Sequence, residues 1–361
     1  MQVKQKRLTK KSIKKSFLNS KKKHLLITGS KGSGKSTLLN ELINDFDIVG
    51  INSYAVKEDG VYLKKDDKTI QIGKFNKSIE TTDKRMQALS DGFKIAQIFI
   101  EELINSNNEF VYIDEIGYLE NDQSDYQNNL INLFDKKRVI AVIRKQDSSF
   151  INELKNRDDV YVVDIDMPFD NVGLVIMASG FSKRFVDNKL LYKLEEKTLI
   201  ETVIEKTKDY FKNIVVVTRY KEVKDICDRL DCDVIVHDYL YKNDTIRLGL
   251  NYLKDKVDSC MFMTSDQPEL LEDTISGMII YYNNNPCNII RLSYKDNVGN
   301  PVIFPKYYFN ELLNLPIGKG GNIIIKNNPD KVKCYEAFNE LELFDIDSKE
   351  DIEKLRKRKE A

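Results

Sequence analysis

Short apolar runs alternate with amphipathic stretches along most of this chain. Apolar residues recur at helical spacing in residues 36–43 and 95–103, which predicts amphipathic helices there. Strands that alternate with helices are typical of a parallel sheet covered on both faces, so we expect an α/β domain. In this first half, the buried strands are predicted at residues 24–28, 110–113, 139–143 and 160–165.

A second series of the same kind follows a predicted linker at residues 166–171, where Pro168 and Asp170 interrupt the pattern. A helical stretch at residues 197–211 lies between its strands. The length of 361 residues suits two domains, and we predict them over residues 24–168 and 172–361. The strands of this second α/β domain are predicted at residues 172–178, 213–218, 233–237 and 260–264.

The first 23 residues differ from the rest, because they contain ten lysines and arginines and no acid. We predict a solvated, partly disordered basic tail over residues 1–23. The alternative is a segment that binds RNA, anionic lipid or a protein partner. No aromatic stacking pattern accompanies the lysines, which argues against RNA.

The composition of the chain excludes few classes of protein. Basic and acidic residues are equal in number at 57 each, so bulk charge gives no reason to expect nucleic acid or a membrane surface as a partner. No apolar run approaches the ~20 residues of a membrane-spanning helix, and no signal-type core follows the basic N-terminus. The five cysteines form no C-x-x-C pair and only two histidines are present, so we expect reduced thiols in a cytoplasmic protein.

A glycine-rich loop connects the first predicted strand to the helix at residues 36–43. Residues 29–36 read G-S-K-G-S-G-K-S and match the complete phosphate-loop pattern G-x-x-x-x-G-K-[ST]. The glycines let backbone N–H groups turn towards phosphate oxygens, and the helix N-terminus attracts the anion. Lys35 is predicted to reach the β- and γ-phosphates and Ser36 to be a Mg²⁺ ligand. We expect ATP or GTP to be bound by Gly29, Ser30, Lys31, Gly32, Ser33, Gly34, Lys35, Ser36 and Thr37.

Two acids follow the strand predicted at residues 110–113. Ligands of open α/β sheets bind at the carboxyl edge of the strands, where Asp114 and Glu115 stand. Asp114 is predicted to hold the Mg²⁺ shell together with Ser36. Glu115 is predicted to orient or deprotonate a water, with a plain surface acid as the alternative.

The phosphate loop and the block I-D-E-I-G-Y-L-E at residues 113–120 resemble the small nucleoside-triphosphatase family, whose second block reads D-E-I-G-x-x-E. The resemblance covers about residues 22–165. It implies slow hydrolysis of nucleoside triphosphates with broad base specificity. Arg144 and Lys145 follow the third strand and are candidates to stabilise transition-state charge, or else a solvated strand end.

The second domain has its own loop of small and basic residues after its first strand. Small residues allow backbone N–H groups to approach phosphates, and the cations of Arg184 and Lys189 neutralise triphosphate charge. Asp266 ends the strand at residues 260–264 and is a predicted Mg²⁺ ligand. The predicted nucleotide contacts here are Ala178, Ser179, Gly180, Arg184, Lys189 and Thr245.

In order, these blocks resemble the MobA-like nucleotidyltransferases, and among them most closely the molybdenum cofactor cytidylyltransferases. The shared blocks are residues 176–191, S-D-Q-P at 265–268, G-N-P-V-I-F at 299–304 and D-I-D-S-K-E-D at 345–351. The resemblance covers about residues 172–356 and implies a Rossmann-like α/β sandwich. Ser179 stands where cytidylyl members have alanine and guanylyl members have glycine, which favours CTP. Residues that depart from the family pattern are Val186, Ser265, Gly318 and, in part, Thr245.

The resemblance implies transfer of a nucleoside monophosphate to a phosphate-bearing acceptor, with release of pyrophosphate. Catalysis is expected to rest on positioning and charge neutralisation by Asp266, Arg184 and Lys189. Asp345 or Asp347 is predicted to complete the metal or acceptor site. The alternative is that this segment only caps the last helix, with Ser348 and Asp351 as a capping box.

The sequence therefore predicts a cytidylyltransferase for molybdenum cofactor fused to an NTP-hydrolysing P-loop domain. One alternative keeps the nucleotidyl transfer but uses a sugar or polyol phosphate as acceptor. Another makes the P-loop domain a nucleotide-binding regulatory or delivery module. Expected partners are the small-molecule acceptor, molybdopterin above all, and a molybdoenzyme or its accessory proteins, without membrane or nucleic acid.

Overall fold

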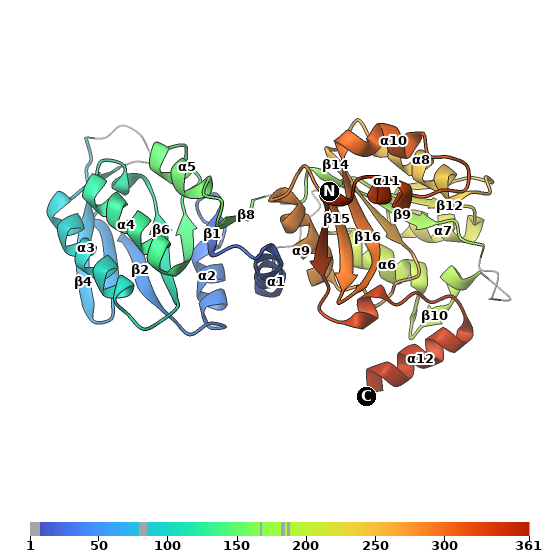
Figure 1. The fold of residues 1–361 in the computed structure, drawn as a ribbon, viewed down its shortest axis with the longest axis horizontal. Coiled ribbons are helices and arrows are strands. Elements are labelled where there is room, and N and C mark those ends of the chain that lie inside the picture. Colours follow the sequence, from blue (N-terminus) through green and yellow to red (C-terminus); the bar gives the residue numbers. More distant parts are fainter. Residues whose placement is uncertain (1–7, 79–84, 167, 182–184, 186–187, 361) are drawn as a thin grey trace. The chain divides into compact units, whose positions relative to one another are not determined.

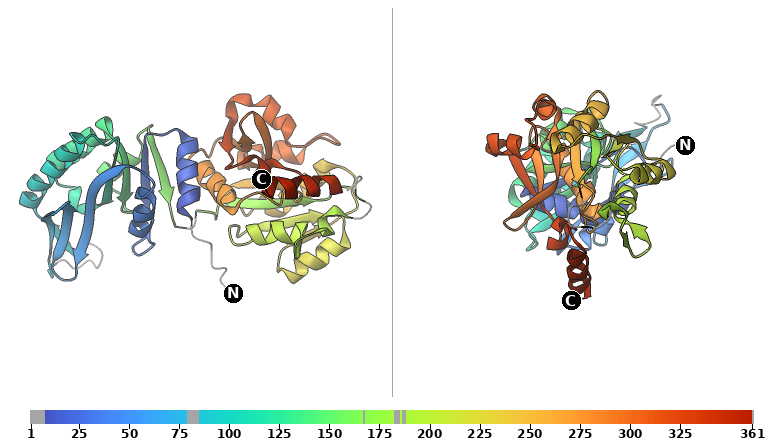
Figure 2. Two further views of the ribbon diagram at one scale, coloured as in Figure 1. Left: turned by 90° about the horizontal axis from the view of Figure 1, so that it is seen from below. Right: turned by 90° about the vertical axis from the view of Figure 1, so that its right-hand side faces the viewer.

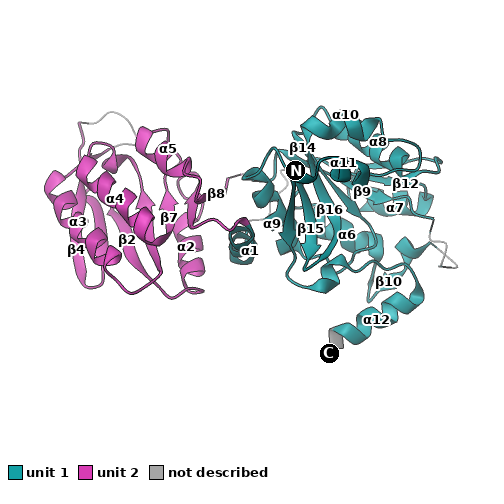
Figure 3. Cartoon of the chain, viewed as in Figure 1, with its two compact units in different colours: residues 1–19, 167–361 teal, residues 20–166 magenta. Residues whose placement is uncertain are grey.

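The computed structural model describes residues 8–78, 85–166, 168–181, 185 and 188–360. The chain divides into two compact units (Figure 3). The P-loop unit comprises residues 20–166. The split unit comprises residues 1–19 and 167–361, so in chain order the P-loop unit is inserted between its two parts.

The P-loop unit contains an eight-stranded sheet in the order β5-β4-β3-β2-β6-β7-β1-β8 (Figure 1). The predicted strands β6, β7, β1 and β8 pair in parallel, as expected, and the unpredicted strand β2 pairs in parallel with β6. The expectation of a wholly parallel sheet is wrong, because β3, β4 and β5 extend it as antiparallel strands. The strands are β1 (His24–Thr28), β2 (Ile48–Val56), β3 (Gly60–Lys65), β4 (Lys68–Phe75), β5 (Met86–Ala88), β6 (Phe110–Ile116), β7 (Arg138–Ile143) and β8 (Val160–Asp164).

Tight turns account for the antiparallel extension. Glu58 and Asp66 adopt left-handed φ angles of 57° and 53° in the turns after β2 and β3. Hairpin turns require such angles, which fit the twist of antiparallel strands. Neither turn carries glycine at that position, although the Asp59-Gly60 pair in the first turn was a usable hairpin signal.

Helices α3, α4 and α5 pack on this sheet through one hydrophobic cluster that includes Phe93, Phe134 and Phe150. Helix α2 follows the phosphate loop and buries three leucines. The helices are α2 (Lys35–Ile43), α3 (Ser90–Ile104), α4 (Ser124–Lys136) and α5 (Ser149–Lys155), with a short 3-10 helix at Tyr118–Glu120.

The split unit contains a seven-stranded mixed sheet in the order β13-β12-β9-β14-β16-β15-β17. Strands β13, β12, β9 and β14 are parallel, and β16 is antiparallel to both β14 and β15. The α/β class is confirmed, although this sheet too is mixed. Its strands are β9 (Val172–Ala178), β12 (Ile214–Thr218), β13 (Val234–Val236), β14 (Ser259–Thr264), β15 (Ile289–Tyr294), β16 (Asn297–Pro305) and β17 (Val332–Glu336), beside a small hairpin of β10 (Lys193–Leu194) and β11 (Lys197–Thr198).

Helices cover this second sheet, and its strands β9, β12, β14 and β16 share one core with α8 and α10. Gly249 in α8 permits close packing, because a Cβ there would lie 2.6 Å from Val175. The helices are α6 (Leu199–Thr207), α7 (Lys221–Arg229), α8 (Lys242–Leu253), α9 (Glu272–Asn283), α10 (Phe309–Leu313), α11 (Asn322–Asn327) and α12 (Lys349–Glu360). Short 3-10 helices lie at Lys189–Leu191, Lys306–Tyr308, Pro329–Lys331 and Glu340–Leu343.

The solvated tail expected for residues 1–23 is wrong where the structure describes it. Residues Lys10–Ser20 form helix α1, which lies beside α9 of the split unit (Figure 2). Ile13 and Phe17 are fully buried, and Ser16 donates a hydrogen bond to the carbonyl of Gly277 in α9. The two apolar residues are four positions apart and share one helix face, a pattern that the many lysines concealed.

All five cysteines are free thiols, as expected. Among the described residues, no helix is long and apolar enough to cross a membrane.

Candidate nucleotide sites

The phosphate loop lies between β1 and α2, as the sequence predicted. Gly32 and Gly34 have φ angles of 77° and 94°, in the left-handed region that glycine adopts without strain. The Ser33 hydroxyl donates to the carbonyl of Ser30 over 2.8 Å and closes the loop on itself. The loop conformation is therefore fixed in part by its own residues.

Lys35 is buried and its ammonium group lies on the loop itself. Its Nζ donates to the carbonyl oxygens of Gly29 at 2.9 Å and Ser30 at 2.8 Å. Both acceptors are neutral, and a charge-assisted bond to a phosphate oxygen is about twice as strong as a neutral one. A bound triphosphate would therefore compete well for this ammonium group.

Ser36 and Asp114 meet at the carboxyl edge of the sheet. The Ser36 hydroxyl donates to Oδ1 of Asp114 over 2.9 Å. Burial raises the pKa of Asp114, against the opposing effect of the Ser36 hydrogen bond. A hydroxyl and a largely buried carboxylate side by side fit the two protein ligands that Mg²⁺ takes in P-loop sites.

Glu115 is held in an unusual backbone conformation. The pairing of β6 with β7 shifts register between Ile113 and Ile116, and Glu115 has a φ of 75°, which is strained for a residue with a side chain. This bulge turns the Glu115 carboxylate to Arg144, whose Nε lies 2.8 Å from Oε1. The predicted water-orienting acid is therefore paired with the arginine that the sequence proposed as a transition-state cation.

Glu120 contacts the backbone next to the pair formed by Glu115 and Arg144. Its Oε2 accepts the backbone N–H of Gly117 over 2.8 Å, and burial raises its pKa to about 7. Gly117 lies directly under Arg144, because a Cβ there would be 2.9 Å from Cδ of the arginine. The spacing of glycine and the second glutamate in D-E-I-G-x-x-E thus shapes the surface on which Arg144 rests.

The sequence missed Asp166 as a loop contact. Its carboxylate accepts the backbone N–H of Ser30 over 2.7 Å and the Ser30 hydroxyl over 3.0 Å. Lys145 forms ion pairs with Asp164 and Asp166, at 2.8 and 3.2 Å. Two acids just after a strand at the carboxyl edge were a usable signal. Lys31 and Thr37 lie exposed in the same loop and helix start.

The loop of the split unit follows β9, and a cavity of about 350 Å³ opens beside it. Ala178 ends β9 and is buried. Arg184 and Val186, which were singled out in the sequence, lie outside the described residues. Of the predicted contacts, the cavity is lined by Ser179, Gly180, Lys189, Thr245 and Asp266.

An acidic cluster surrounds Lys189 on one side of this cavity. Its Nζ lies 2.8 Å from Asp266 and 2.9 Å from Asp347, and it also donates to the carbonyl of Ile346. Although burial opposes it, these two carboxylates raise the pKa of Lys189. The lysine therefore neutralises two carboxylates here, rather than standing open for phosphates as the sequence suggested.

Negative charge remains at this cluster. Burial and the neighbouring Asp266 raise the pKa of Asp345 to about 6, so it is largely ionised at neutral pH beside Asp266 and Asp347. Oδ1 of Asp266 is buried and has no hydrogen-bond partner among the residues that the structure describes. One lysine against three carboxylates and an unpaired oxygen fit a divalent cation. Within the described residues no group of three or more His, Cys, Asp or Glu is arranged to hold a metal, so its remaining ligands would come from phosphate and water.

A second cavity of about 740 Å³ adjoins the first. The two share Met177 and Lys242 in their walls. Gln267 and Asp345 line the larger cavity at the end that carries the acidic cluster. Aromatic rings, amides and cations also line it, namely Phe262, Phe304, Phe344, Asn300, Asn322, Arg291, Lys242 and Arg358.

Three further residues at the smaller cavity escaped the sequence analysis: Arg219 and Lys242 line it, and His237 lies behind Ser179. Arg219 donates from Nε to the carbonyl of Ser179 over 2.9 Å, and its guanidinium lies 3.8 Å from the centre of the Phe181 ring. His237 bonds to the Ser179 hydroxyl at 2.8 Å. Arg219 and His237 each directly follow a parallel strand, and Lys242 begins α8, so position at the carboxyl edge was the available signal.

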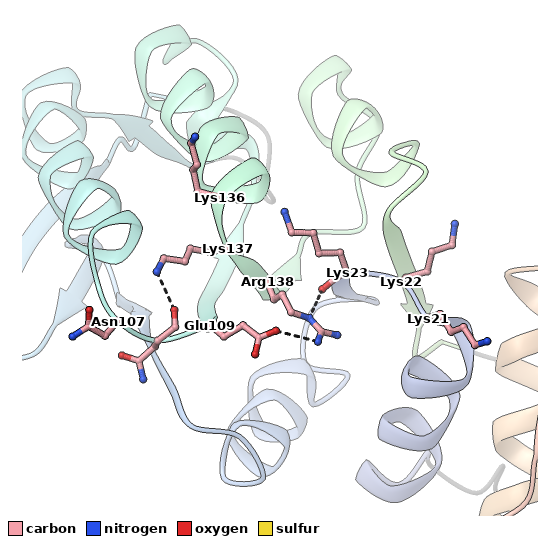
Figure 4. A pocket seen from close by; sticks show the side chains of 9 residues that line it. Lys21, Lys22, Lys23, Asn107, Glu109, Lys136, Lys137 and Arg138 are labelled. Carbon is pink, nitrogen blue, oxygen red and sulfur yellow. Dashed lines mark hydrogen bonds and ion pairs between the residues drawn. The ribbon is translucent and has the colours of Figure 1, made fainter.

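A basic pocket of about 570 Å³ lies at the opposite edge of the P-loop unit (Figure 4). Its lysines mostly cap backbone carbonyls. Lys23 donates to Phe134 and Asp135, where α4 ends, and Lys137 donates to Asn108 beyond α3. Lysines near the last turn of a helix stabilise its unpaired carbonyls. This cluster is explained by capping.

Comparison with known proteins assigns both halves. Residues 24–171 match the NTPase family, and residues 174–332 match the MobA-like NTP transferase domain. The nucleoside-triphosphatase THEP1 of Thermotoga sp. is 25% identical over 156 residues, which are 39% of this chain and 86% of that protein. A probable molybdenum cofactor guanylyltransferase of Aquifex aeolicus is 28% identical over 100 residues, 28% of this chain. The chain spans only about half, 48%, of the length of that relative.

Among solved structures, Rv0371c of Mycobacterium tuberculosis is 21% identical and covers 52% of this chain and 97% of its own. Its TM-score is 0.47. The family matches agree with the two sites found in the two units. Residues 24–171 form a domain of the NTPase family and residues 174–332 form a MobA-like NTP transferase domain, so the protein is a fusion of the two.

Proposed function

We propose that the split unit transfers a cytidylyl group from CTP to molybdenum cofactor, and that the P-loop unit hydrolyses ATP or GTP. The observation that carries the transfer is the pair of adjoining cavities that share Lys242 and Met177 beside Asp266. A nucleotidyltransferase needs a donor site and an acceptor site that meet at the reacting phosphorus.

The smaller cavity suits the donor nucleotide. Ser179 and Gly180 offer a backbone that phosphates can approach, and Phe181 and Tyr241 offer aromatic faces for a base. Ser179 carries a Cβ, as the alanine of cytidylyl members does, which supports CTP. The Aquifex relative is named a guanylyltransferase, so GTP is the competing donor in the test below.

The larger cavity suits a flat, phosphate-bearing acceptor. Phe262 and Phe304 provide apolar surface, while Arg291 and Lys242 provide positive charge for a phosphate. Gln267 and Asn300 can pair with ring nitrogens and carbonyls. These features support a pterin phosphate such as molybdopterin, with a sugar or polyol phosphate as the second candidate.

In the proposed step, an oxygen of the acceptor phosphate attacks the α-phosphorus in line. The bond from that phosphorus to the oxygen of the β-phosphate breaks, and pyrophosphate leaves. Lys242 lies at the junction of the cavities and would neutralise the phosphate that is transferred. Arg184 is proposed to hold the leaving phosphates, while Lys189 keeps Asp266 and Asp347 in place.

Mg²⁺ would be held by Asp266, with Asp345 or Asp347 close by, and when bound it would supply charge neutralisation at the phosphates. Asp266 presents its unpaired Oδ1 for that purpose. In the P-loop unit, Ser36 and Asp114 would hold the corresponding ion. Glu115 and Arg144 would then act on the water and on the γ-phosphate, respectively.

The test is a transfer reaction with the full chain, molybdopterin, Mg²⁺ and CTP, GTP or ATP in turn. Pyrophosphate and the mass of the pterin product are measured. We expect a pterin dinucleotide from CTP. A product from GTP alone would reassign the base, and a product only with sugar or polyol phosphates would assign the second acceptor. No pyrophosphate with any combination would reject the transfer.

The hydrolysis proposal has a separate readout, because a P-loop triphosphatase releases inorganic phosphate. A full chain that binds ATP or GTP but releases phosphate only at the background rate would instead support a regulatory or delivery module. Molybdoenzymes or their accessory proteins are the proposed recipients of the product.

A further inference from the structure

His237 lies beside the smaller cavity and is hydrogen-bonded through both of its ring nitrogens. His237 follows β13, and its Nδ1 lies 3.1 Å from the backbone nitrogen of Tyr239. Its Nε2 lies 2.8 Å from Oγ of Ser179. The same hydroxyl lies 3.0 Å from the carbonyl oxygen of Val217 in β12.

These contacts fix where every proton stands. A backbone N–H can only donate, so Nδ1 of His237 accepts and carries no proton. The neutral ring then carries its proton on Nε2 and donates it to Ser179. A carbonyl can only accept, so the single hydroxyl proton of Ser179 goes to Val217.

Ser179 therefore has no proton left for a nucleobase. Its hydroxyl is held towards Val217 and His237, and the serine offers the cavity its Cβ and backbone, as an alanine would. Without His237, the hydroxyl could turn and donate to an acceptor atom on the base.

We infer that His237 is a positioning residue for base selection, which makes Ser179 behave as alanine towards the nucleobase of the donor. This inference rests on the proposed nucleotidyl transfer and names the residue that regulates specificity at that site. His237 touches no substrate in this account and acts only through Ser179.

The surrounding contacts make this arrangement rigid. Arg219 donates from Nε to the carbonyl of Ser179 and from Nη2 to the carbonyl of Tyr239 at 2.7 Å, so both segments that carry the network are tied together. The rings of His237 and Tyr239 stack with centroids 5.9 Å apart. Rotation of the Ser179 hydroxyl is thus opposed by a network that spans β9, β12 and the residues after β13.

The test compares the full chain with Ser179→Ala, Ser179→Gly, His237→Phe, His237→Gln and the double variant Ser179→Ala with His237→Phe. For each, kcat/KM is measured for CTP and GTP by formation of the pterin dinucleotide. Hydrolysis at the P-loop does not contribute to that product. The reported quantity is the ratio of the two values.

We expect Ser179→Ala to leave the ratio within about twofold, because the hydroxyl proton is not used, and Ser179→Gly to shift it towards GTP by about tenfold. His237→Phe should change the ratio about two- to tenfold, the usual worth of one hydrogen bond. The double variant should return to the wild-type ratio, since no hydroxyl remains. His237→Gln can still donate to Ser179 and should stay near wild type.

Two results would overturn the inference while leaving the transfer itself intact. One is a Ser179→Ala ratio that shifts as far as that of Ser179→Gly. The other is an equal effect of His237→Phe with and without the serine hydroxyl. Failure of the wild type to form any dinucleotide would instead reject the proposed function.

A spectroscopic measurement tests the proposed proton positions without turnover. The chain has only two histidines, so their ring nitrogens can be assigned by NMR in the full chain with His24→Asn as reference. We expect the Nε2–H form for His237 at neutral pH. The Nδ1–H form would contradict the proposed direction of both hydrogen bonds.

Discussion

The two nucleotide sites of this chain hold their lysines in opposite ways. Lys35 of the P-loop rests on two neutral carbonyls of its own loop, whereas Lys189 of the transferase domain lies between the carboxylates of Asp266 and Asp347. A phosphate can draw the first lysine away, because a charged acceptor replaces neutral ones. To draw the second away would leave the partly exposed carboxylates of Asp266 and Asp347 without their cation, which costs free energy unless a metal ion replaces it.

The two lysines thus have different roles, although each follows a loop of small residues after the first strand of its domain. Lys35 is available to bind a phosphate, whereas Lys189 holds Asp266 and Asp347 together on the acidic side of the transferase cavity. The phosphate loop is closed by a contact between its own Ser33 and Ser30, and one acid from outside the loop, Asp166, also accepts from Ser30. The transferase loop is fastened from outside, by Arg219, Tyr220 and His237.

The largest effect is expected from Asp266→Asn. The change removes the charge that Lys189 and a divalent ion share, and we expect transfer to fall about a thousandfold, or ~4 kcal/mol of transition-state stabilisation. Pyrophosphate and inorganic phosphate are measured in one preparation. Phosphate release by the P-loop unit should stay at the wild-type rate. A loss of transfer below tenfold would show that Asp266 does not hold the divalent ion that transfer needs.

Glu115→Gln tests the P-loop side of the comparison. We expect hydrolysis to fall about a hundredfold, because the amide cannot take a proton from water. The binding constant for ATP and Mg²⁺ should change little, since Lys35 and the loop are untouched. Glu120→Gln is the matched control, because its side-chain oxygen still accepts the N–H of Gly117. Equal losses in both variants would assign Glu115 a structural role.

The sequence predicted those parts of the fold that depend on contiguous residues. The phosphate loop, its strand and its helix were readable because spacing alone defines them. Eight strands were readable from apolar runs, four in each domain, while β2 to β5, β15 to β17 and helix α1 were not predicted. The lysines of α1 hid its two buried residues, and the hairpin turns use Glu58 and Asp66 where glycine is usual.

The transferase cluster was only partly predictable for a different reason. Asp266 and Asp347 lie 77 and 158 positions from Lys189, so no spacing rule connects them. The bulge at Glu115 is also invisible in the sequence, because it depends on the pairing of β6 with β7. The acids could be identified from their position at strand ends. Which cation each acid contacts depends on tertiary packing, which the sequence does not reveal.

His24 makes the stability of the P-loop unit depend on pH. His24 is buried in the P-loop unit, with Nδ1 accepting the N–H of Val139 and Nε2 facing Asp159 at 3.2 Å. Burial lowers its pKa from 6.5 to about 4 despite that carboxylate, so the contact involves a neutral ring at pH 7. The unfolded chain binds more protons between these values. Stability is therefore complete above pH 6.5 and is lost as the pH falls through 4, by about 3 kcal/mol in total.

Calorimetry of the full chain measures this effect in the transition that ATP and Mg²⁺ raise, which identifies the P-loop unit. We expect its midpoint to fall between pH 7 and 5 in the wild type. His24→Asn keeps an acceptor for Val139 and cannot titrate in this range, so its profile should be flatter. Parallel profiles for the two proteins would refute a buried neutral imidazole as the cause.

The smallest effect is expected at residues 345–351. From the sequence, this segment could either complete the metal or acceptor site or only cap the last helix. The Ser348 hydroxyl accepts the N–H of Asp351 at the start of α12, so it caps that helix. Asp347 meanwhile contacts Lys189, so the segment serves both purposes. Ser348→Ala should lower the free energy of unfolding of the split unit by about 1 kcal/mol, measured by urea denaturation.

Transfer should change less than threefold in Ser348→Ala, because the backbone N–H of Asp347 still donates to Asp351 over 3.2 Å and keeps the carboxylate near Lys189. Asp347→Asn is the matched comparison, since it leaves the cap intact and removes one charge from the cluster. It should slow transfer more than Ser348→Ala while costing less stability. The reverse order would mean that the cap, rather than the carboxylate, positions this side of the transferase cavity.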